Sequence, residues 1–376
     1  MKKKQKNIKK ILIRIILIVL FLAGAWLTKE SLRTSSTADI EGENSIATIE
    51  TLDIGNIKQQ MMFRGVDSSN PVLLILHGGP GMPLIGYSRH VTEKLENHFV
   101  VVSWEQRGAG KLYDQDIPLE TMNIEQFVVD TIEVIEYLKN RFGVSSVYVC
   151  GLSWGAIVGP MTASRRPDLV KAYIGVGQMT NVLESELLGY NMMLEKAEEA
   201  GNEEALKELK EIGTPPYKSL EDFMNSRKWL GEFGNKFDAT MQGLVVSYLL
   251  GASEYTFFES LRVPGAIEFS LNHLFKEVFA VNLFETVPRL DVPVYLLMGK
   301  DDTIIFGSVA ERYFNSLIAP KGKTLIWFEG GHYFNHQYKT EFQDALIDRV
   351  LAETTEIKNP DESNNSKHTK ASSRLD

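Results

Sequence analysis

Short apolar runs alternate with stretches of helical periodicity through the middle of the 376-residue chain. Most of the short runs are apolar at every position, which is typical of strands covered on both faces in a parallel sheet. The helical stretches span 124–141, 154–165 and 339–351. We therefore predict an α/β fold with a mostly parallel sheet flanked by helices, and an active site at the carboxyl ends of the strands. The predicted strands are 46–52, 57–63, 72–76, 99–104, 147–150, 172–176, 292–298 and 324–328.

The alternation stops between residues 179 and 287, where helical patterns cover 182–200 and 203–212 and a further helix begins at Ser219. Ser219 and the two acidic residues that follow Leu220 are typical of a helix start. An all-helical stretch inserted into an α/β pattern predicts a cap over the sheet edge, with a separate helical domain as the alternative. The α/β core is then expected at 47–178 and 288–353.

The N-terminus combines a basic run with an apolar one. Residues 11–27 are apolar except for Arg14, and as a helix they reach roughly 26 Å, close to the thickness of a bilayer's hydrocarbon core. Basic residues before a span favour a cytoplasmic N-terminus. We predict that residues 1–30 anchor the chain in the cell membrane with the rest outside. The sequence Ala23-Gly24-Ala25 leaves a cleaved signal segment, and hence secretion, as the alternative. Polar residues predict a linker at 31–46 and a disordered tail at 354–376.

Charge and cysteine content exclude several other classes of protein. The formal net charge is -9, and seven of the 40 basic residues lie in the first 14 positions, so the body of the chain is strongly acidic. Such a body is a poor match for nucleic acid. Cys150 is the only cysteine, which excludes an intramolecular disulfide and a cysteine-based zinc cluster. Nothing in the sequence implies a metal or organic cofactor.

The strongest chemical signal is Gly151-Leu152-Ser153-Trp154-Gly155, which follows a predicted strand and precedes a predicted helix. In such a turn the serine hydroxyl rises above the sheet, and flanking glycines avoid steric collisions. Ser153 is the predicted nucleophile.

A glycine-rich loop, His77-Gly78-Gly79-Pro80-Gly81, follows the strand at 72–76. Its backbone N–H groups are free to face a ligand, and together with the N–H after the nucleophile they predict an oxyanion hole. We assign the two donors to Gly79 and Trp154. His77 is expected to orient the loop.

A carboxylate and a histidine follow two later strands. Asp302 lies three residues after Gly299, and His332 ends the sequence Glu329-Gly330-Gly331-His332. We predict His332 as the base and Asp302 as the group that orients it, in preference to His336 and Asp301. The order Ser, Asp, His is the one found on α/β-hydrolase sheets. Arg107, in the turn after the strand at 99–104, is expected in an internal ion pair.

These motifs resemble the proline iminopeptidase branch of the α/β-hydrolases. The resemblance rests on HGGPG at 77–81, WEQRG-x-G at 104–110, G-x-SWG at 151–155, G-x-x-D at 299–302 and GH at 331–332. It implies the α/β-hydrolase fold, the roles given above to Ser153, Asp302, His332, Gly79 and Trp154, and release of an N-terminal residue, often proline, from short peptides.

The chain departs from that family in three places. Leu152 and Glu105 stand where the family usually has Gly and Asp, and 177–181 lacks the family's usual pattern. Family members bind the substrate's amino terminus with cap carboxylates. Glu184 and Glu186 are tentative candidates for this role, with a solvated helix face as the alternative. We therefore expect a membrane-tethered peptidase that works through an acyl-enzyme. The alternatives are a carboxylesterase or lactonase with the same triad, and an inactive surface binding module.

Overall fold

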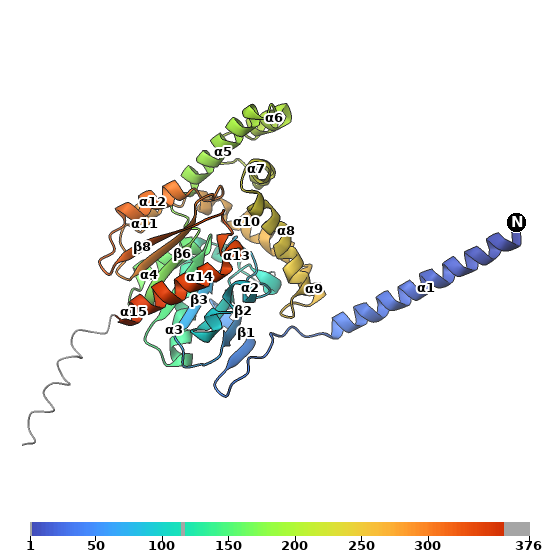
Figure 1. Cartoon of the computed structure of the whole chain (residues 1–376), viewed down its shortest axis with the longest axis horizontal. Helices are drawn as coiled ribbons and strands as arrows, with labels where there is room; N and C mark the ends of the chain where they lie inside the picture. Colours follow the sequence, from blue (N-terminus) through green and yellow to red (C-terminus); the bar gives the residue numbers. More distant parts are fainter. Residues whose placement is uncertain (1, 114–116, 357–376) are drawn as a thin grey trace, which may run out of the picture.

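The computed structural model describes residues 2–113 and 117–356, which form an eight-stranded sheet with helices on both faces (Figure 1). The strand order is β1-β2-β4-β3-β5-β6-β7-β8. Each predicted strand is present, with its ends within two residues of the predicted ones. β1 and β2 pair antiparallel, as do β2 and β4, and the remaining pairs are parallel. The strands are Ile46–Ile54 (β1), Ile57–Gly65 (β2), Val72–Leu76 (β3), Val100–Glu105 (β4), Val147–Leu152 (β5), Val170–Val176 (β6), Val294–Gly299 (β7) and Lys323–Phe328 (β8).

Two apolar clusters, one on each face, hold the helices to the sheet. Leu74 and Leu76 of β3 point into a cluster with α3 (Ile124–Phe142), α4 (Gly155–Arg165) and α12 (Gly307–Ser316). Leu73 and Ile75 point into the opposite cluster, which includes α14 (Lys339–Asp344) and the helical turns after it. Because both faces are buried, the central strands are apolar at every position. The short elements α2 (Arg89–Thr92) and α13 (Phe334–Gln337) and the 3₁₀ turns Leu95–Asn97, Gly110–Leu112 and Leu119–Thr121 complete these layers.

The C-terminal helix differs from the prediction in shape and length. After α14 the chain passes through a π-helical segment, Ala345–Leu351, into α15 (Ala352–Glu356). The helix thus extends into the first residues of the expected tail, because the Thr354 hydroxyl is buried against that of Tyr148 at 2.7 Å. The rest of that expected tail, 357–376, lies outside the described residues.

Between β6 and β7 the chain is helical, and most of these helices lie together beside the sheet, whereas the last of them, Leu283–Thr286, lies next to α12 (Figure 1). Five of them begin at an Asn or Ser whose side chain accepts a backbone N–H of the first turn: Asn181, Asn202, Ser219, Asn235 and Asn282. Such caps satisfy N–H groups that have no partner within the helix. The helices are Val182–Glu199 (α5), Glu203–Ile212 (α6), Leu220–Phe233 (α7), Lys236–Gly251 (α8), Phe257–Ser260 (α9), Val263–Phe279 (α10) and Leu283–Thr286 (α11).

A long N-terminal helix, α1 (Lys2–Leu32), projects away from the rest of the molecule (Figure 1). Its stretch Ile11–Leu32 is long and apolar enough to cross a membrane, and no residue of the most apolar 18-residue segment within it is buried by the rest of the chain. A signal sequence would have the same composition.

Candidate active site

Ser153 occupies a strained turn between β5 and α4. Its φ is +50°, a left-handed conformation that side chains rarely adopt, and its N–H donates to the Val176 carbonyl at 2.9 Å. A Cβ on Gly151 would lie 2.3 Å from the Gly155 oxygen, and one on Gly155 would lie 2.3 Å from the Leu76 oxygen. The turn therefore requires both glycines, as the sequence motif indicates.

Asp302 and His332 are joined by a hydrogen bond of 2.8 Å between the carboxylate Oδ2 and the imidazole Nδ1. The other carboxylate oxygen accepts the N–H groups of Ile304 and Ile305 at 2.9 and 2.8 Å. Asp301, in contrast, has an exposed side chain, and its N–H donates to the Gly330 carbonyl. The structure thus places Asp302, and not Asp301, beside the histidine.

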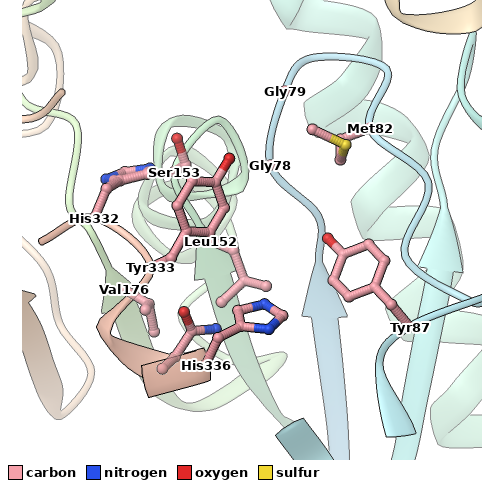
Figure 2. Close-up of a pocket in the computed structure, with 11 residues that line it drawn as sticks. Gly78, Gly79, Met82, Tyr87, Leu152, Ser153, Val176, His332, Tyr333 and His336 are labelled. Carbon is pink, nitrogen blue, oxygen red and sulfur yellow. The ribbon is translucent and has the colours of Figure 1, made fainter. Parts of the chain in front are cut away.

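Ser153 and His332 face one another across the mouth of a cavity (Figure 2). The Ser153 hydroxyl lies 4.0 Å from the sulfur of Met179. Gly177 lies directly against the imidazole. A Cβ at this position would lie 2.8 Å from the ring carbon Cε1 of His332, so the ring position requires a glycine here. His336 also lines the cavity but lies beside Tyr87, away from Ser153. His332 is therefore the histidine placed to act on the serine.

A second carboxylate, Asp238 at the start of α8, holds the backbone of the histidine loop. Its two oxygens accept the N–H groups of His332 at 2.7 Å and Tyr333 at 2.9 Å. Three residues earlier, the N–H of Asn235 donates to the Thr303 hydroxyl at 3.1 Å, next to Asp302. One turn of the cap thus contacts both the acid loop and the base loop. The sequence analysis did not identify Asp238.

The surroundings of His332 favour its protonated form. Burial of the ring opposes protonation, but the charge and hydrogen bond of Asp302 and the charge of Asp238 outweigh this effect. The pKa of His332 therefore lies above its ordinary value. An imidazole in this setting readily takes up a proton from a neighbouring hydroxyl.

His77 orients the glycine-rich loop, as predicted. Its Nε2 accepts the N–H of Gln106 at 3.1 Å, so its Nδ1 carries the proton and donates to the Gly78 carbonyl at 2.7 Å. Burial lowers the pKa of His77 to about 4, which keeps the ring neutral. The Gln106 amide oxygen in turn accepts the indole N–H of Trp154 at 3.3 Å. These bonds connect the glycine-rich loop to Trp154, the residue after the serine. Within residues 2–113 and 117–356, the backbone N–H groups of Gly79 and Trp154 have no protein acceptor.

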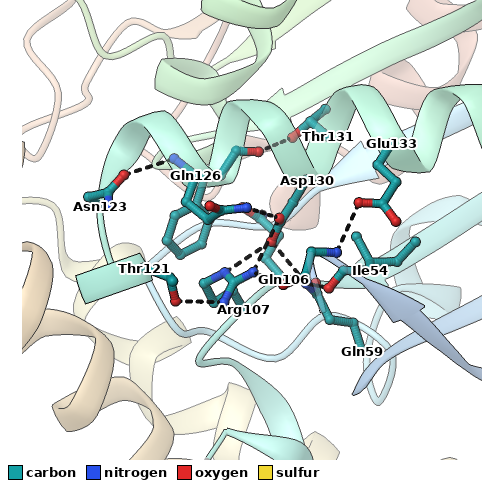
Figure 3. Close-up of polar contacts among 12 residues, drawn as sticks. Ile54, Gln59, Gln106, Arg107, Thr121, Asn123, Gln126, Asp130, Thr131 and Glu133 are labelled. Atoms are coloured by element: carbon teal, nitrogen blue, oxygen red, sulfur yellow. Dashed lines mark hydrogen bonds and ion pairs between the residues drawn. The ribbon is translucent and has the colours of Figure 1, made fainter. Parts of the chain in front are cut away.

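Arg107 forms the predicted internal ion pair, with Asp130 (Figure 3). The pair is fully buried, and the guanidinium reaches the carboxylate at 3.0 and 3.2 Å. Gln59 and Gln126 also donate to Asp130, and Thr121 and the Gly55 carbonyl accept from Arg107. This network stabilises the fold, and neither of its charged residues lines the cavity at Ser153.

The cavity between the sheet edge and the cap has a volume of about 350 Å³. Its lining is mostly apolar, and its charged side chains are Glu186 of α5 and Arg227 of α7 together with His332. Glu186 and Arg227 form an ion pair with each other. Glu184 points elsewhere, because both its oxygens accept from Arg312 at 2.6 and 2.7 Å and it lines neither cavity that reaches Ser153. Of the two tentative residues, Glu186 alone lies near the serine.

In the part of the chain that the structure describes, no group of three or more His, Cys, Asp or Glu side chains is placed to hold a metal ion. The sole cysteine, Cys150, is buried in β5, and burial raises the pKa of its thiol to about 12.

Several known proteins are similar to this chain in sequence or in fold. Residues 71–203 match the family model described as "alpha/beta hydrolase fold". The probable aminopeptidase YbaC of Bacillus subtilis (strain 168) is 35% identical over 294 residues, which cover 77% of this chain and 91% of that protein. The proline iminopeptidase-related protein TTHA1809 from Thermus thermophilus has a similar structure, with a TM-score of 0.56 and 20% identity over 82% of this chain and 99% of that one. A 2-hydroxy-6-oxo-6-phenylhexa-2,4-dienoate hydrolase from Rhodococcus sp. strain RHA1 aligns with a TM-score of 0.54 and 20% identity over 82% and 99% of the two chains. The chain belongs to the α/β-hydrolase family, as the motif resemblance indicates.

Proposed function

We propose that this hydrolase is an aminopeptidase that releases N-terminal residues from short peptides through an acyl-enzyme on Ser153. In this proposal His332 is the general base, and Asp302 orients it and stabilises its protonated form. The N–H groups of Gly79 and Trp154 bind the oxyanion. The observation that carries the proposal is the 2.8 Å bond between the Asp302 carboxylate and Nδ1 of His332. This bond fixes the tautomer in which Nε2 is free to accept a proton.

The reaction follows from these positions. As the Ser153 oxygen attacks the scissile carbonyl carbon, its proton passes to Nε2 of His332. The carbonyl oxygen becomes negative and accepts hydrogen bonds from the two free N–H groups. His332 then gives the proton to the departing amine, the C–N bond breaks, and the acyl group stays on Ser153. A water molecule, deprotonated by His332, attacks this ester and releases the acid and the free serine.

Glu186 is our candidate for binding the substrate's free amino group. Its carboxylate is buried in the cavity wall. Burying an ammonium group there is costly without an opposite charge, and this carboxylate would supply that charge. The relative from Bacillus subtilis carries the name of an aminopeptidase, which supports this class of substrate. Because Glu186 pairs with Arg227, the ammonium group would have to share or displace that partner.

An esterase acting on apolar acyl groups is the second candidate. The cavity lining favours this candidate. The charges of Glu186 and Arg227 cancel each other, and much of the remaining lining is apolar, including Phe223, Leu271 and Phe275. An acyl ester needs no charged anchor in such a pocket.

Side-by-side turnover of matched substrates separates the two candidates. We would offer the full chain in detergent an amino-acid arylamide, its N-acetylated form and a short acyl ester, with Ser153→Ala as the blank. The peptidase proposal expects turnover of the free-amino arylamide and loss of turnover on acetylation. Strong ester turnover with no turnover of either arylamide would contradict it.

Glu186→Gln and Glu184→Gln are a matched pair for the amino-group assignment. Both remove one carboxylate from α5, but only Glu186 lies at the cavity. We expect Glu186→Gln to lower kcat/KM for the free-amino arylamide while leaving the ester unaffected, and Glu184→Gln to change neither. Equal losses for arylamide and ester would indicate a structural role for Glu186 and contradict the assignment.

We also propose that α1 anchors the protein in a membrane, with the N-terminus in the cytoplasm and the hydrolase outside. The candidate span and the basic residues before it support this arrangement. Protease added outside intact cells should digest the hydrolase and leave the first residues protected. Protection of the hydrolase instead would contradict the proposed orientation.

A further inference from the structure

One edge of the cap exposes three large apolar side chains next to α1. Leu250 at the end of α8 is 49% exposed, Phe258 in α9 is 43% exposed, and Leu261 just after α9 is 58% exposed. Outside α1, four other large apolar side chains among the described residues are comparably exposed, and these are spread over the molecule: Leu119, Val129, Met224 and Ile318. We call Leu250, Phe258 and Leu261 the apolar edge. Such a group of exposed apolar side chains is typical of a surface that contacts a membrane or another protein.

The apolar edge lies beside the candidate membrane span itself. The ring of Phe257 in α9 packs edge-on against Trp26 of α1, with centroids 4.9 Å apart. Trp26 falls inside the span Ile11–Leu32, about 9 Å along the helix axis before its end. Tryptophan in a membrane helix is typical of the interface between hydrocarbon and water. If α1 crosses the bilayer, α9 therefore sits at interface depth.

The chain between α1 and the sheet holds this arrangement in place. Arg33 donates to the Ala252 carbonyl at 2.9 Å, and the N–H of Ser36 donates to the Ser253 carbonyl at 3.0 Å. The next residue, Thr37, is bonded to Glu254 at 3.1 Å. The stretch predicted as a linker thus runs along the segment between α8 and α9 through hydrogen bonds. These hydrogen bonds hold the cap close to the end of α1.

We infer that the apolar edge inserts into the outer interface of the bilayer that holds α1, so that the cap is docked on lipid. This inference rests on the proposed membrane anchor. The partner is the lipid surface, because α9 packs against Trp26 and Trp26 is itself part of the candidate span. The docking holds the hydrolase in one orientation at the membrane, within reach of substrates that concentrate there.

Fluorescence quenching of the full chain in phosphatidylcholine vesicles tests this inference. Since Cys150 is buried, a cysteine introduced by Leu261→Cys can carry a single environment-sensitive fluorophore. Ile318→Cys is the matched control, because Ile318 is 54% exposed and lies between α12 and β8, across the molecule from α9 (Figure 1). Wild-type protein gives the background labelling.

We expect nitroxide-labelled lipid to quench the probe at 261 several-fold more strongly than the probe at 318, and aqueous iodide to show the reverse order. A second variant, Leu250→Asp combined with Phe258→Asp, should weaken lipid quenching at 261 while hydrolysis of a water-soluble substrate stays unchanged. Equal iodide quenching at both sites would mean that the edge faces water, and shielding from both quenchers would mean that protein covers it. Either result overturns the docking inference. Flotation of the vesicles separates this failure from failure of the anchor, because protein that does not float with the lipid overturns both.

Discussion

Asp238, in the first turn of α8, accepts the backbone N–H groups of His332 and Tyr333 at 2.7 and 2.9 Å. The loop that carries the base is thereby fixed by the cap as well as by Asp302. Gly331 allows the close approach, because a Cβ there would lie 2.2 Å from the Asp238 carboxylate. The position of the imidazole thus depends on how the cap is seated on the sheet edge.

Asp238→Asn should impair catalysis without unfolding the chain. An amide accepts through one oxygen only, so one of the two N–H groups loses a charge-assisted bond worth about 1.5–3 kcal/mol. We expect kcat to fall roughly tenfold or more. The acid limb of the pH profile of kcat/KM should also move to lower pH, because the Asp238 charge raises the pKa of His332.

Asp222→Asn is the matched control. Asp222 holds the same position after the N-cap of α7 as Asp238 holds in α8, but the N–H groups of His332 and Tyr333 donate to Asp238 and not to Asp222. It should change neither kcat nor the pH profile. An unshifted profile in Asp238→Asn, with activity at the control level, would exclude a positioning role for Asp238.

The pH dependence of kcat/KM should report His332. The base acts only when neutral, so activity is lost as pH falls through its pKa. We expect that midpoint above about 6.5, the ordinary value for histidine, because Asp302 and Asp238 outweigh the effect of burial. Asp302→Asn should lower the midpoint and reduce kcat by as much as ~10⁴-fold. A wild-type midpoint well below 6.5 would contradict this account of the site.

Gly177→Ala should displace the imidazole. The new methyl group would lie 2.8 Å from Cε1 of His332, so the ring has to move. A displacement of about 1 Å is expected to lower kcat by on the order of 10²-fold. Gly201→Ala is the control, since Gly201 has a similar φ of +61° and nothing within 4 Å of the new Cβ. Equal activities of the two variants would show that the contact at Gly177 does not matter.

The Arg107–Asp130 pair should matter for stability and not for the reaction. Asp130→Asn leaves a buried guanidinium without its counter-charge, which typically costs about 3–5 kcal/mol of unfolding free energy. Glu125→Gln breaks the exposed pair with Arg165 and should cost less than about 1 kcal/mol. Urea unfolding followed by tryptophan fluorescence measures both. A similar small loss for the two variants would contradict a structural role for the buried pair.

The sequence predicted those features of the site that are encoded locally. Ser153 lies in a five-residue turn, and Asp302 and His332 each follow the glycine-rich end of a strand, so short motifs identify them. The strands were predictable because burial on both faces makes them continuously apolar. Even the preference for Asp302 over Asp301 needed only the distance from Gly299.

Features that depend on packing between distant segments were not predictable. Asp238 lies 94 residues before His332 and shares its local pattern with Asp222, which lines neither cavity that reaches Ser153. Glu184 and Glu186 are two positions apart on α5 and face different partners, Arg312 and Arg227, which the sequence does not reveal. The hydrogen bonds of residues 33–37 to the segment between α8 and α9 likewise join a polar stretch to residues more than 200 positions away.

Covalent labelling of the full chain with a fluorophosphonate tests the central claim most directly. The reagent should form one adduct, located on Ser153 by peptide mass spectrometry. The rate of labelling should fall about 10²–10⁴-fold in His332→Ala, because the general base is lost. Labelling at Ser153 that is equally fast without the imidazole, or no adduct at Ser153 in the folded wild type, would contradict the account.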